Sequence, residues 1–163
     1  MEPGAWYYDA VAFVCSNGLF NGTSEGRFSP DGTMTRAMLI TVLARSAGVD
    51  TTTGDSWYSA AVAWAQESGV SDGTALEEPV TREQLAAILY RYAQYRKLDT
   101  DASAKLNSFT DADSVSAYAS EALGWAVSEG LINGASGKLM PKGDATRAQV
   151  AAILHRFVKN VLN

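Results

Sequence analysis

The chain has 163 residues, of which 47% are hydrophobic and 19% charged, so its composition is that of a globular and not of a disordered protein. Its formal net charge of −5 and a pI near 4.8 argue against recognition of nucleic acid or of an anionic membrane through bulk charge. No apolar run approaches the roughly 20 residues of a membrane-spanning helix, so membrane insertion is not expected.

The N-terminal segment, Met1 to Gly4, lacks the basic and apolar stretches of a signal peptide. Because this segment lies so close to Trp6, we expect the chain to be a fragment of a longer protein. Cys15 is the single cysteine, so we expect neither a disulfide nor a thiolate metal centre and interpret Cys15 as a helix residue.

One pattern occurs three times, which indicates a repeat architecture. Each copy has two aromatic residues seven positions apart, then a Gly-x-x-x-Gly pentapeptide, a Thr-Arg pair, and a second arginine nine positions after the first. The aromatic pairs are Trp6 and Phe13, Trp57 and Trp64, and Tyr118 and Trp125; the pentapeptides are Gly18–Gly22, Gly69–Gly73 and Gly130–Gly134. The arginines are Arg36 with Arg45, Arg82 with Arg91, and Arg147 with Arg156.

In chain order, the copies predict a first unit over 1–48, a second over 49–98, a linker near 99–106 and a third unit over 107–163. Each unit predicts a helix, a glycine-bounded loop and a second helix. In the second unit, Trp57, Ala61 and Trp64 fall on one face of a helix, and Gly69 is placed to end it.

The second helix of each unit is predicted to begin after a threonine cap. Thr81 and Thr146 each have Gln three positions later, as in the capping box, whereas Thr35 has Met38 and keeps only the cap. One apolar face follows in each helix, formed by Leu39, Val42, Leu43, Leu85, Ile88, Leu89, Val150, Ile153 and Leu154. A unit of about 50 residues buries too little surface alone. The predicted fold is therefore all-α, with three helix-loop-helix repeats forming one pseudo-threefold, three-pronged body.

Arg36, Arg82 and Arg147 are predicted at the first helical position, where a cation costs roughly 0.3–1 kcal/mol. Beside unpaired helix N–H groups, however, a guanidinium is a good receptor for a carboxylate or phosphate. The alternative is an ion pair with a carboxylate of a neighbouring unit, for which Asp50 and Asp111 are candidates; the residues alone leave both interpretations open. The second arginine of each copy is rotated about 180° around the helix, so we predict that it faces elsewhere as a structural brace. Aromatic side chains can stack on sugars, but at helical spacing we favour a core role.

The order of these motifs resembles the S-layer homology domain. The first unit has the aromatic-rich start Trp6–Val11, the pentapeptide, Phe28-Ser29-Pro30, and Met34-Thr35-Arg36-Ala37, and the third unit adds Phe109-Thr110-Asp111. The resemblance covers nearly the whole chain.

The resemblance implies a non-catalytic bacterial cell-wall module, extracellular and part of a larger surface protein, without a cofactor or a metal. Its partner would be a secondary cell-wall polysaccharide, often carrying acidic pyruvate ketals, bound in grooves between repeats. It assigns Arg36, Arg82 and Arg147 to the anionic substituent, Gly22, Gly73 and Gly134 to close approach of the sugar, and Trp6, Trp57 and Tyr118 to packing beside it. Asp50 and Asp111 complete the candidate site residues, and Thr35, Thr81 and Thr146 are the structural caps.

This chain departs from the family pattern in two respects. The family usually has glutamate two residues after the first arginine, where this chain has Met38, Gln84 and Gln149. The second unit also lacks the aromatic-x-Pro tip. We therefore expect three unequal grooves, at least one of them degenerate.

Two other function classes remain open. A helical protein–protein scaffold would use the Thr-Arg arginines as ion pairs between repeats. An enzyme is the weaker alternative, because His155 and Cys15 belong to no repeated site and do not suggest a triad or a metal centre. Asp111-Ala112-Asp113 begins like a calcium-binding loop. However, the sixth position of the loop is not glycine, and Glu121 stands one residue before the twelfth position, where the loop needs a glutamate. A glycosidase carboxylate pair stays open, although no acid stands out.

Overall fold

The computed structural model describes residues 8–16, 31–134 and 137–162. The α-helices in this part of the chain are α1 (Tyr8–Ser16), α2 (Arg36–Ser46), α3 (Ser59–Ser68), α4 (Arg82–Tyr95), α5 (Ser120–Ser128) and α6 (Arg147–Phe157). Two short 3-10 turns, η1 (Ala112–Ser114) and η2 (Ala117–Ala119), precede α5, and a π-helical turn, η3 (Val158–Leu162), follows α6. The described residues form isolated β-bridges but no strand, so the all-α prediction is confirmed.

The predicted helix starts are present. Thr81 accepts a hydrogen bond from the backbone N–H of Gln84 at 3.3 Å, and the Gln84 side chain accepts one from the Thr81 N–H at 3.0 Å. Thr146 begins α6 with the same capping box. Thr35 accepts from the Met38 N–H at 3.2 Å without the box, because Met38 has no oxygen to return the bond.

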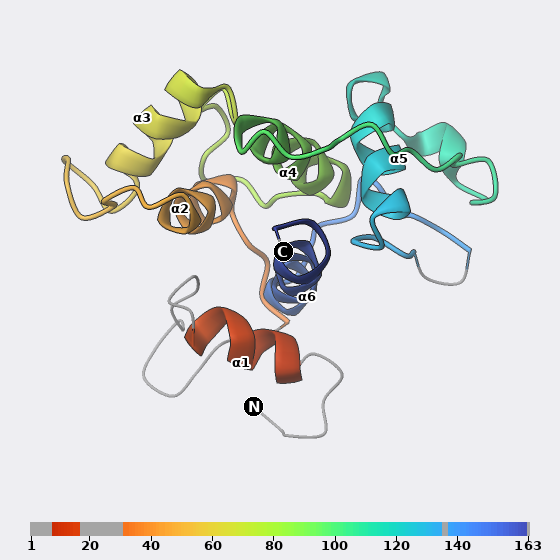
Figure 1. Ribbon diagram of the computed structural model, residues 1–163, viewed down its shortest axis with the longest axis horizontal. Helices are drawn as coiled ribbons and strands as arrows, with labels where there is room; N and C mark the ends of the chain where they lie inside the picture. Colours follow the sequence, from red (N-terminus) through yellow and green to blue (C-terminus); the bar gives the residue numbers. More distant parts are fainter. Residues whose placement is uncertain (1–7, 17–30, 135–136, 163) are drawn as a thin grey trace.

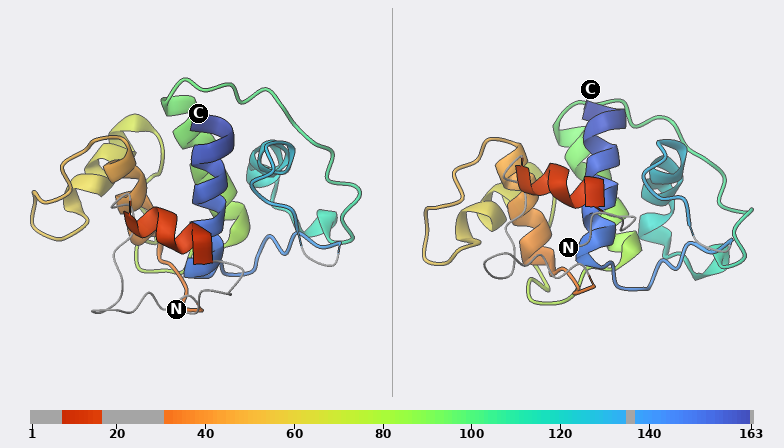
Figure 2. Two further views of the ribbon diagram at one scale, coloured as in Figure 1. Left: turned by 60° about the horizontal axis from the view of Figure 1, so that its bottom comes forward. Right: turned by 90° about the horizontal axis from the view of Figure 1, so that it is seen from below.

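Helices α2, α4 and α6 run side by side in the same direction at the centre, and α3, α5 and α1 lie outside them (Figures 1 and 2). Helix α3 packs against α2, α5 against α4, and α1 against α6. Each packed pair therefore joins the second helix of one unit to the first helix of the next, and the third unit closes back on the first.

Backbone hydrogen bonds join the three segments that lead into the central helices. The first N–H of each central helix donates to a carbonyl in the loop of another unit: Arg36 to Glu78 at 3.1 Å, Arg82 to Gly143 at 3.0 Å, and Arg147 to Gly32 at 2.8 Å. The bridged residues are Thr35 with Pro79, Thr81 with Asp144, and Thr33 with Thr146. In every unit, the first N–H of the central helix donates to one neighbouring unit, and a loop carbonyl accepts from the other neighbouring unit.

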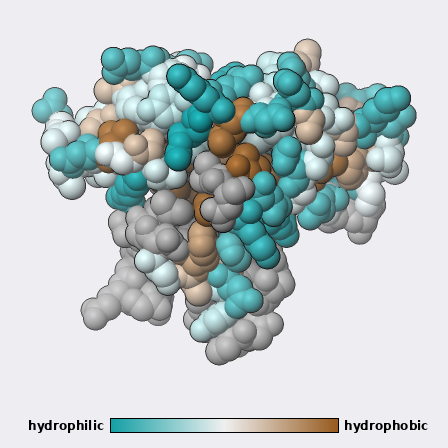
Figure 3. Space-filling model, in the orientation of Figure 1, coloured by the Kyte–Doolittle hydropathy of each residue, from teal (hydrophilic) through white to brown (hydrophobic). Residues whose placement is uncertain are grey.

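The core lies between the central helices and their partners. All nine predicted apolar-face residues are buried, with at most 7% of their surface exposed. Trp125 is fully buried and Trp64 packs against the core, as expected for the second aromatic of each copy. Residues of the outer surface are mainly hydrophilic on the face shown in Figure 3. No helix among the described residues has both the length and the apolarity needed to cross a bilayer.

The first aromatic residues lie differently from the prediction. Trp57 precedes α3 instead of lying on its face, because the Ser56 N–H donates to the Ser59 hydroxyl at 3.0 Å and the helix begins only at Ser59. Tyr118 lies in η2, ahead of α5. Both side chains are more than half exposed, so the core interpretation is wrong for these two positions.

Candidate ligand-binding grooves

The backbone amides at the starts of α2 and α4 already have partners. Besides the first N–H of each helix, the second donates to a loop carbonyl, from Ala37 to Leu76 and from Glu83 to Pro141, both at 3.0 Å. The third donates to the capping threonine. The prediction that unpaired helix amides would receive an anion is therefore wrong at these two helices. The arginine side chains are the donors that remain.

A pocket of about 290 Å³ surrounds Arg82. It lies between the start of α4, the loop that follows Gly130, and α6, so residues of the second and third units form it together. Its polar lining residues are Arg82, Asn133, Gln149 and Arg156, and its apolar ones are Leu131, Ile132, Leu139, Met140, Ala152 and Ile153. We call this pocket the Arg82 groove.

Gln149 holds the Arg82 side chain in this groove. Arg82 Nη2 donates to Gln149 Oε1 at 2.9 Å, and the same oxygen accepts the N–H of Thr146 at 3.0 Å. Burial lowers the pKa of Arg82, opposed by the charge of Asp144, yet an arginine remains protonated in proteins. A glutamate at position 149 would neutralise this guanidinium, whereas the amide orients it and leaves its charge available.

Arg156 lines the same groove and donates from Nη1 to the Leu131 carbonyl at 3.1 Å. This hydrogen bond agrees with the prediction that the second arginine of each copy has a structural role. The prediction that the second arginine faces away from the candidate site is wrong for Arg156. In the second unit the two arginines do diverge, since Arg91 lines a different pocket from Arg82. The packing of the third unit on the second brings Arg156 into the Arg82 groove.

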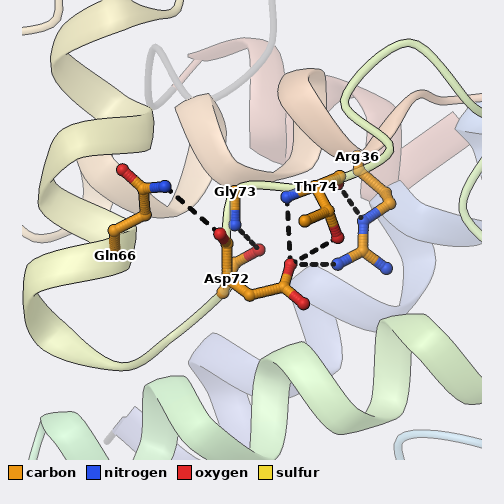
Figure 4. A network of polar contacts seen from close by, with 6 residues as sticks. Arg36, Gln66, Asp72, Gly73 and Thr74 are labelled. Carbon is orange, nitrogen blue, oxygen red and sulfur yellow. Dashed lines mark hydrogen bonds and ion pairs between the residues drawn. The ribbon is translucent and has the colours of Figure 1, made fainter.

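A carboxylate already lies beside the corresponding arginine of α2. We give the name Arg36 groove to the surface formed by Arg36, Asp72 and Thr74. Arg36 Nη2 lies 3.4 Å from Asp72 Oδ1, and Arg36 Nε donates to the Thr74 carbonyl at 3.1 Å (Figure 4). Only 12% of the Arg36 side chain is exposed. The predicted ion pair with a neighbouring unit is thus present, but its acid is Asp72, and neither Asp50 nor Asp111.

Asp50 and Asp111 instead fix loop conformation. Asp111 accepts the N–H of Leu139 on one carboxylate oxygen and that of Met140 on the other, both at 2.8 Å. Asp50 accepts hydrogen bonds from the Thr52 hydroxyl at 2.5 Å and from the Thr52 N–H at 2.9 Å. These hydrogen bonds hold the pKa of both carboxyl groups below the ordinary value. Asp111 shapes the tip of the loop that borders the Arg82 groove, and a direct role of either acid in binding stays a prediction.

Gly73 and Gly134 have left-handed φ values of 78° and 76°, which favour glycine. A Cβ atom on Gly134 would also lie 2.7 Å from the Lys138 carbonyl oxygen and 2.8 Å from the Phe109 ring. Loop geometry alone therefore accounts for glycine at 134. The prediction that it admits a sugar remains untested.

Gly134→Ala is expected to lower the free energy of unfolding by about 2–3 kcal/mol, because left-handed strain and the contact with a backbone oxygen act together. Gly137→Ala is the matched control, since Gly137 has φ 74° with open space around a Cβ, and about 1–2 kcal/mol is expected. Urea denaturation of both variants measures the difference. Equal losses would mean that the close contact is unimportant.

The remaining predicted residues divide between described and undescribed parts of the chain. Arg147 is 3% exposed; burial lowers its pKa, opposed by Cys15. Trp6 and Gly22, its predicted companions, lie outside the described residues.

Burial and the charge of Glu83 raise the pKa of Tyr118, while the charges of Lys142, Arg36 and Arg91 oppose the rise. Tyr118 lines a small pocket together with Arg91 and Gln94 of α4.

The single histidine of the chain packs against an aromatic ring. His155 stacks on Phe13 with ring centroids 4.5 Å apart, where α6 meets α1. Among the residues that the structure describes, no three His, Cys, Asp or Glu side chains are grouped so that they could hold a metal ion.

Comparison with known proteins matches the S-layer homology domain to residues 1–37 and 108–151. These segments include the Thr-Arg pairs of the first and third units, while the whole second unit, 49–98, lies outside the match.

Three relatives can be aligned with nearly the full chain, and each is 27% identical to it over the aligned residues. They are an amylopullulanase of Thermoanaerobacterium thermosulfurigenes (94% of this chain, 9% of the relative), the exoglucanase XynX of Acetivibrio thermocellus (97% and 16%) and a surface-layer 125 kDa protein of Lysinibacillus sphaericus (94% and 14%). The chain therefore spans less than a fifth of each of these relatives.

Proposed function

Because this chain belongs to the S-layer homology domain family, we propose that it anchors its parent protein by binding an anionic, pyruvylated secondary cell-wall polysaccharide. Domains of this family are non-catalytic anchoring modules of surface proteins. Two of the relatives are named as enzymes, but the matched region is only 9% and 16% of their length. An extracellular location at the bacterial cell wall follows from the proposal.

The observation that carries the proposal is the Arg82 groove. It presents two guanidinium groups, from Arg82 and Arg156, next to the neutral amides of Asn133 and Gln149. Its other walls are apolar, so one charged substituent could be held by arginine while the sugar ring packs on carbon. The volume of about 290 Å³ is near the lower end of ligand pockets and suits one sugar unit of a longer chain.

The scaffold alternative has one observation in its favour. Arg36 pairs with Asp72 of the next unit, as an ion pair between repeats would. Arg82 behaves differently: within the described residues its guanidinium has a neutral glutamine as partner and no ion pair. The two proposals therefore make opposite predictions for Arg36 and Arg82.

Arg82→Ala is expected to weaken binding of purified secondary cell-wall polymer about 10- to 100-fold, because a charge-assisted hydrogen bond contributes roughly 1.5–3 kcal/mol. Arg82→Lys should also weaken binding, since lysine keeps the charge but loses the planar fork. Binding is measured by isothermal titration calorimetry against polymer with and without its pyruvate ketals.

Arg36→Ala is the matched control, because its arginine is already paired, and binding within about threefold of the wild type is expected. Melting temperatures of all variants separate loss of binding from loss of folding. Wild-type affinity in Arg82→Ala together with a lowered melting temperature would contradict the proposal and favour the scaffold.

A further inference from the structure

The pentapeptides differ at the position before their second glycine. The first and third have Asn21 and Asn133, whereas the second has Asp72. Asparagine and aspartate have nearly the same shape, so this difference changes mainly the charge. Asn133 lines the Arg82 groove, and Asp72 contacts Arg36. A single charge thus distinguishes two otherwise corresponding positions.

Asp72 is held in place by its own turn and does not depend on Arg36 for its position. Its Oδ1 accepts the Thr74 N–H at 3.0 Å and the Thr74 hydroxyl at 2.7 Å (Figure 4). These two hydrogen bonds, ahead of the charges of Arg36 and Arg91, hold the pKa of Asp72 below its ordinary value. The contact of Asp72 with Arg36 is long, at 3.4 Å, and the Asp72 side chain is 69% exposed, so an incoming anion could displace Asp72 from Arg36. The carboxylate would nevertheless remain beside the anion.

The loops next to the two grooves differ in charge as well. The loop after Gly73 carries Glu77 and Glu78, both exposed, and its Glu78 carbonyl binds the start of α2. The corresponding loop after Gly134 carries Lys138 and Lys142. The loop beside Arg36 therefore carries two acids and no base. The loop beside Arg82 carries two bases and one acid, Asp144, and its Lys142 is paired with Glu83.

We propose that Asp72 is a specificity-determining residue that excludes anionic sugars from the Arg36 groove, so that the pyruvylated polymer is bound at the Arg82 groove. This inference rests on the proposed function. A ligand carboxylate beside Arg36 would meet the fixed charge of Asp72, and two like charges a few ångströms apart near a surface repel strongly enough to reduce affinity about tenfold or more. Asn133, with the same shape and no charge, permits the anion at the other groove.

Two reciprocal variants test the inference. Asp72→Asn keeps an oxygen that can accept both Thr74 bonds, so the turn is expected to survive while the charge is lost. Asn133→Asp introduces the charge into the Arg82 groove. The probe is a monosaccharide glycoside carrying a cyclic pyruvate ketal, and its control carries the isopropylidene ketal, in which a methyl group replaces the carboxylate.

Binding is followed by 1H–15N NMR titration, because separate amides report on each groove. In the wild-type protein the Gly134 and Met140 amides should shift with the pyruvylated probe, while those of Gly73 and Thr74 should respond at least about tenfold more weakly. Asp72→Asn should bring the Gly73 and Thr74 response to within about threefold of that at Gly134. Asn133→Asp should weaken the Gly134 response about tenfold or more.

The outcomes separate the inference from the function on which it rests. If no wild-type groove responds to the pyruvylated probe or responds equally to the isopropylidene control, the proposed function fails. If the Arg82 groove responds but Asp72→Asn gives no new response at Gly73, the inference alone is wrong. The double variant Glu77→Gln with Glu78→Gln is the final control. Binding at the Arg36 groove in that variant, with Asp72 intact, would overturn the role of Asp72.

Discussion

Replacing Tyr92 with alanine is expected to lower the free energy of unfolding by about 3–5 kcal/mol, the range for removing a large buried aromatic side chain. Tyr92 of α4 is fully buried, and its ring packs against Trp64 of α3 and Phe157 of α6, with centroids 6.1 and 5.9 Å apart. Its hydroxyl donates to Ser46 at the end of α2 at 3.0 Å. One side chain thus joins four helices of all three units.

Two variants show whether the ring or the hydroxyl carries this effect. Tyr92→Phe should cost only about 1 kcal/mol, because it keeps the ring and loses the hydrogen bonds with Ser46 and Arg96. Tyr95→Ala is the control on the same helix; Tyr95 also contacts Trp64 but is 42% exposed, so a smaller loss is expected. Guanidinium chloride unfolding followed by tryptophan fluorescence gives the three values. A loss in Tyr92→Ala no larger than in Tyr95→Ala would show that Tyr92 is not a shared support of the units.

Local features of the fold could be predicted from the sequence because they depend on neighbouring residues. The capping box of Thr81 needs only a glutamine three positions later, and the left-handed end of α3 needs only Gly69. The apolar faces of the central helices were equally evident, since a helical period places Leu85, Ile88 and Leu89 together.

The packing of one unit on another could not be predicted in the same way. A helical period says which face is apolar but does not say which helix covers it, and the first helix of each unit covers the second helix of its predecessor. For that reason the position of Arg156 beside Arg82 was missed. Its rotation within α6 was correct, but the groove it faces belongs partly to α4.

Asp72 was also missed as the partner of Arg36, although the sequence contained a signal. Aligning the three pentapeptides shows one acid against two asparagines. Spacing from the first aromatic residue of each unit instead indicates Asp50 and Asp111. Where one copy has a charged residue and the other two copies have a neutral one, that position better indicates which groove differs in its binding.

The second unit departs from its neighbours at another position too. Glu83 follows the first arginine, where the other units have Ala37 and Ala148. Its side chain is 4% exposed and accepts hydrogen bonds from the Ser116 N–H at 2.9 Å, the Ser116 hydroxyl at 2.7 Å and Lys142 Nζ at 2.7 Å. Lys142 and the Ser116 hydroxyl are also in contact. Glu83 therefore ties α4 to two segments of the third unit.

Glu83→Ala is expected to lower the free energy of unfolding by about 2–3 kcal/mol, because it leaves the Ser116 donors without their acceptor and empties a buried site. Lys142→Ala should cost about 1 kcal/mol or less, since the lysine is 58% exposed and the carboxylate keeps both bonds from Ser116. Thermal unfolding at neutral pH compares the two variants. Equal losses would mean that the ion pair, and not the link through Ser116, supports this contact.

The contribution of Glu83 should also depend on pH. Burial alone would raise the pKa of Glu83, but the hydrogen bonds from Lys142 and Ser116 outweigh burial and hold the pKa below the ordinary value of 4.5. A pKa lowered by folding adds stability that is complete above the unfolded-state value and is lost as the pH falls through the folded-state value. The stability gap between wild type and Glu83→Gln should therefore be constant from pH 6 to pH 8 and shrink below roughly pH 4.5. Glu67→Gln, which removes an exposed carboxylate on α3, is the control for loss of one charge. A gap that widens on acidification would show that folding raises the pKa of Glu83 instead of lowering it.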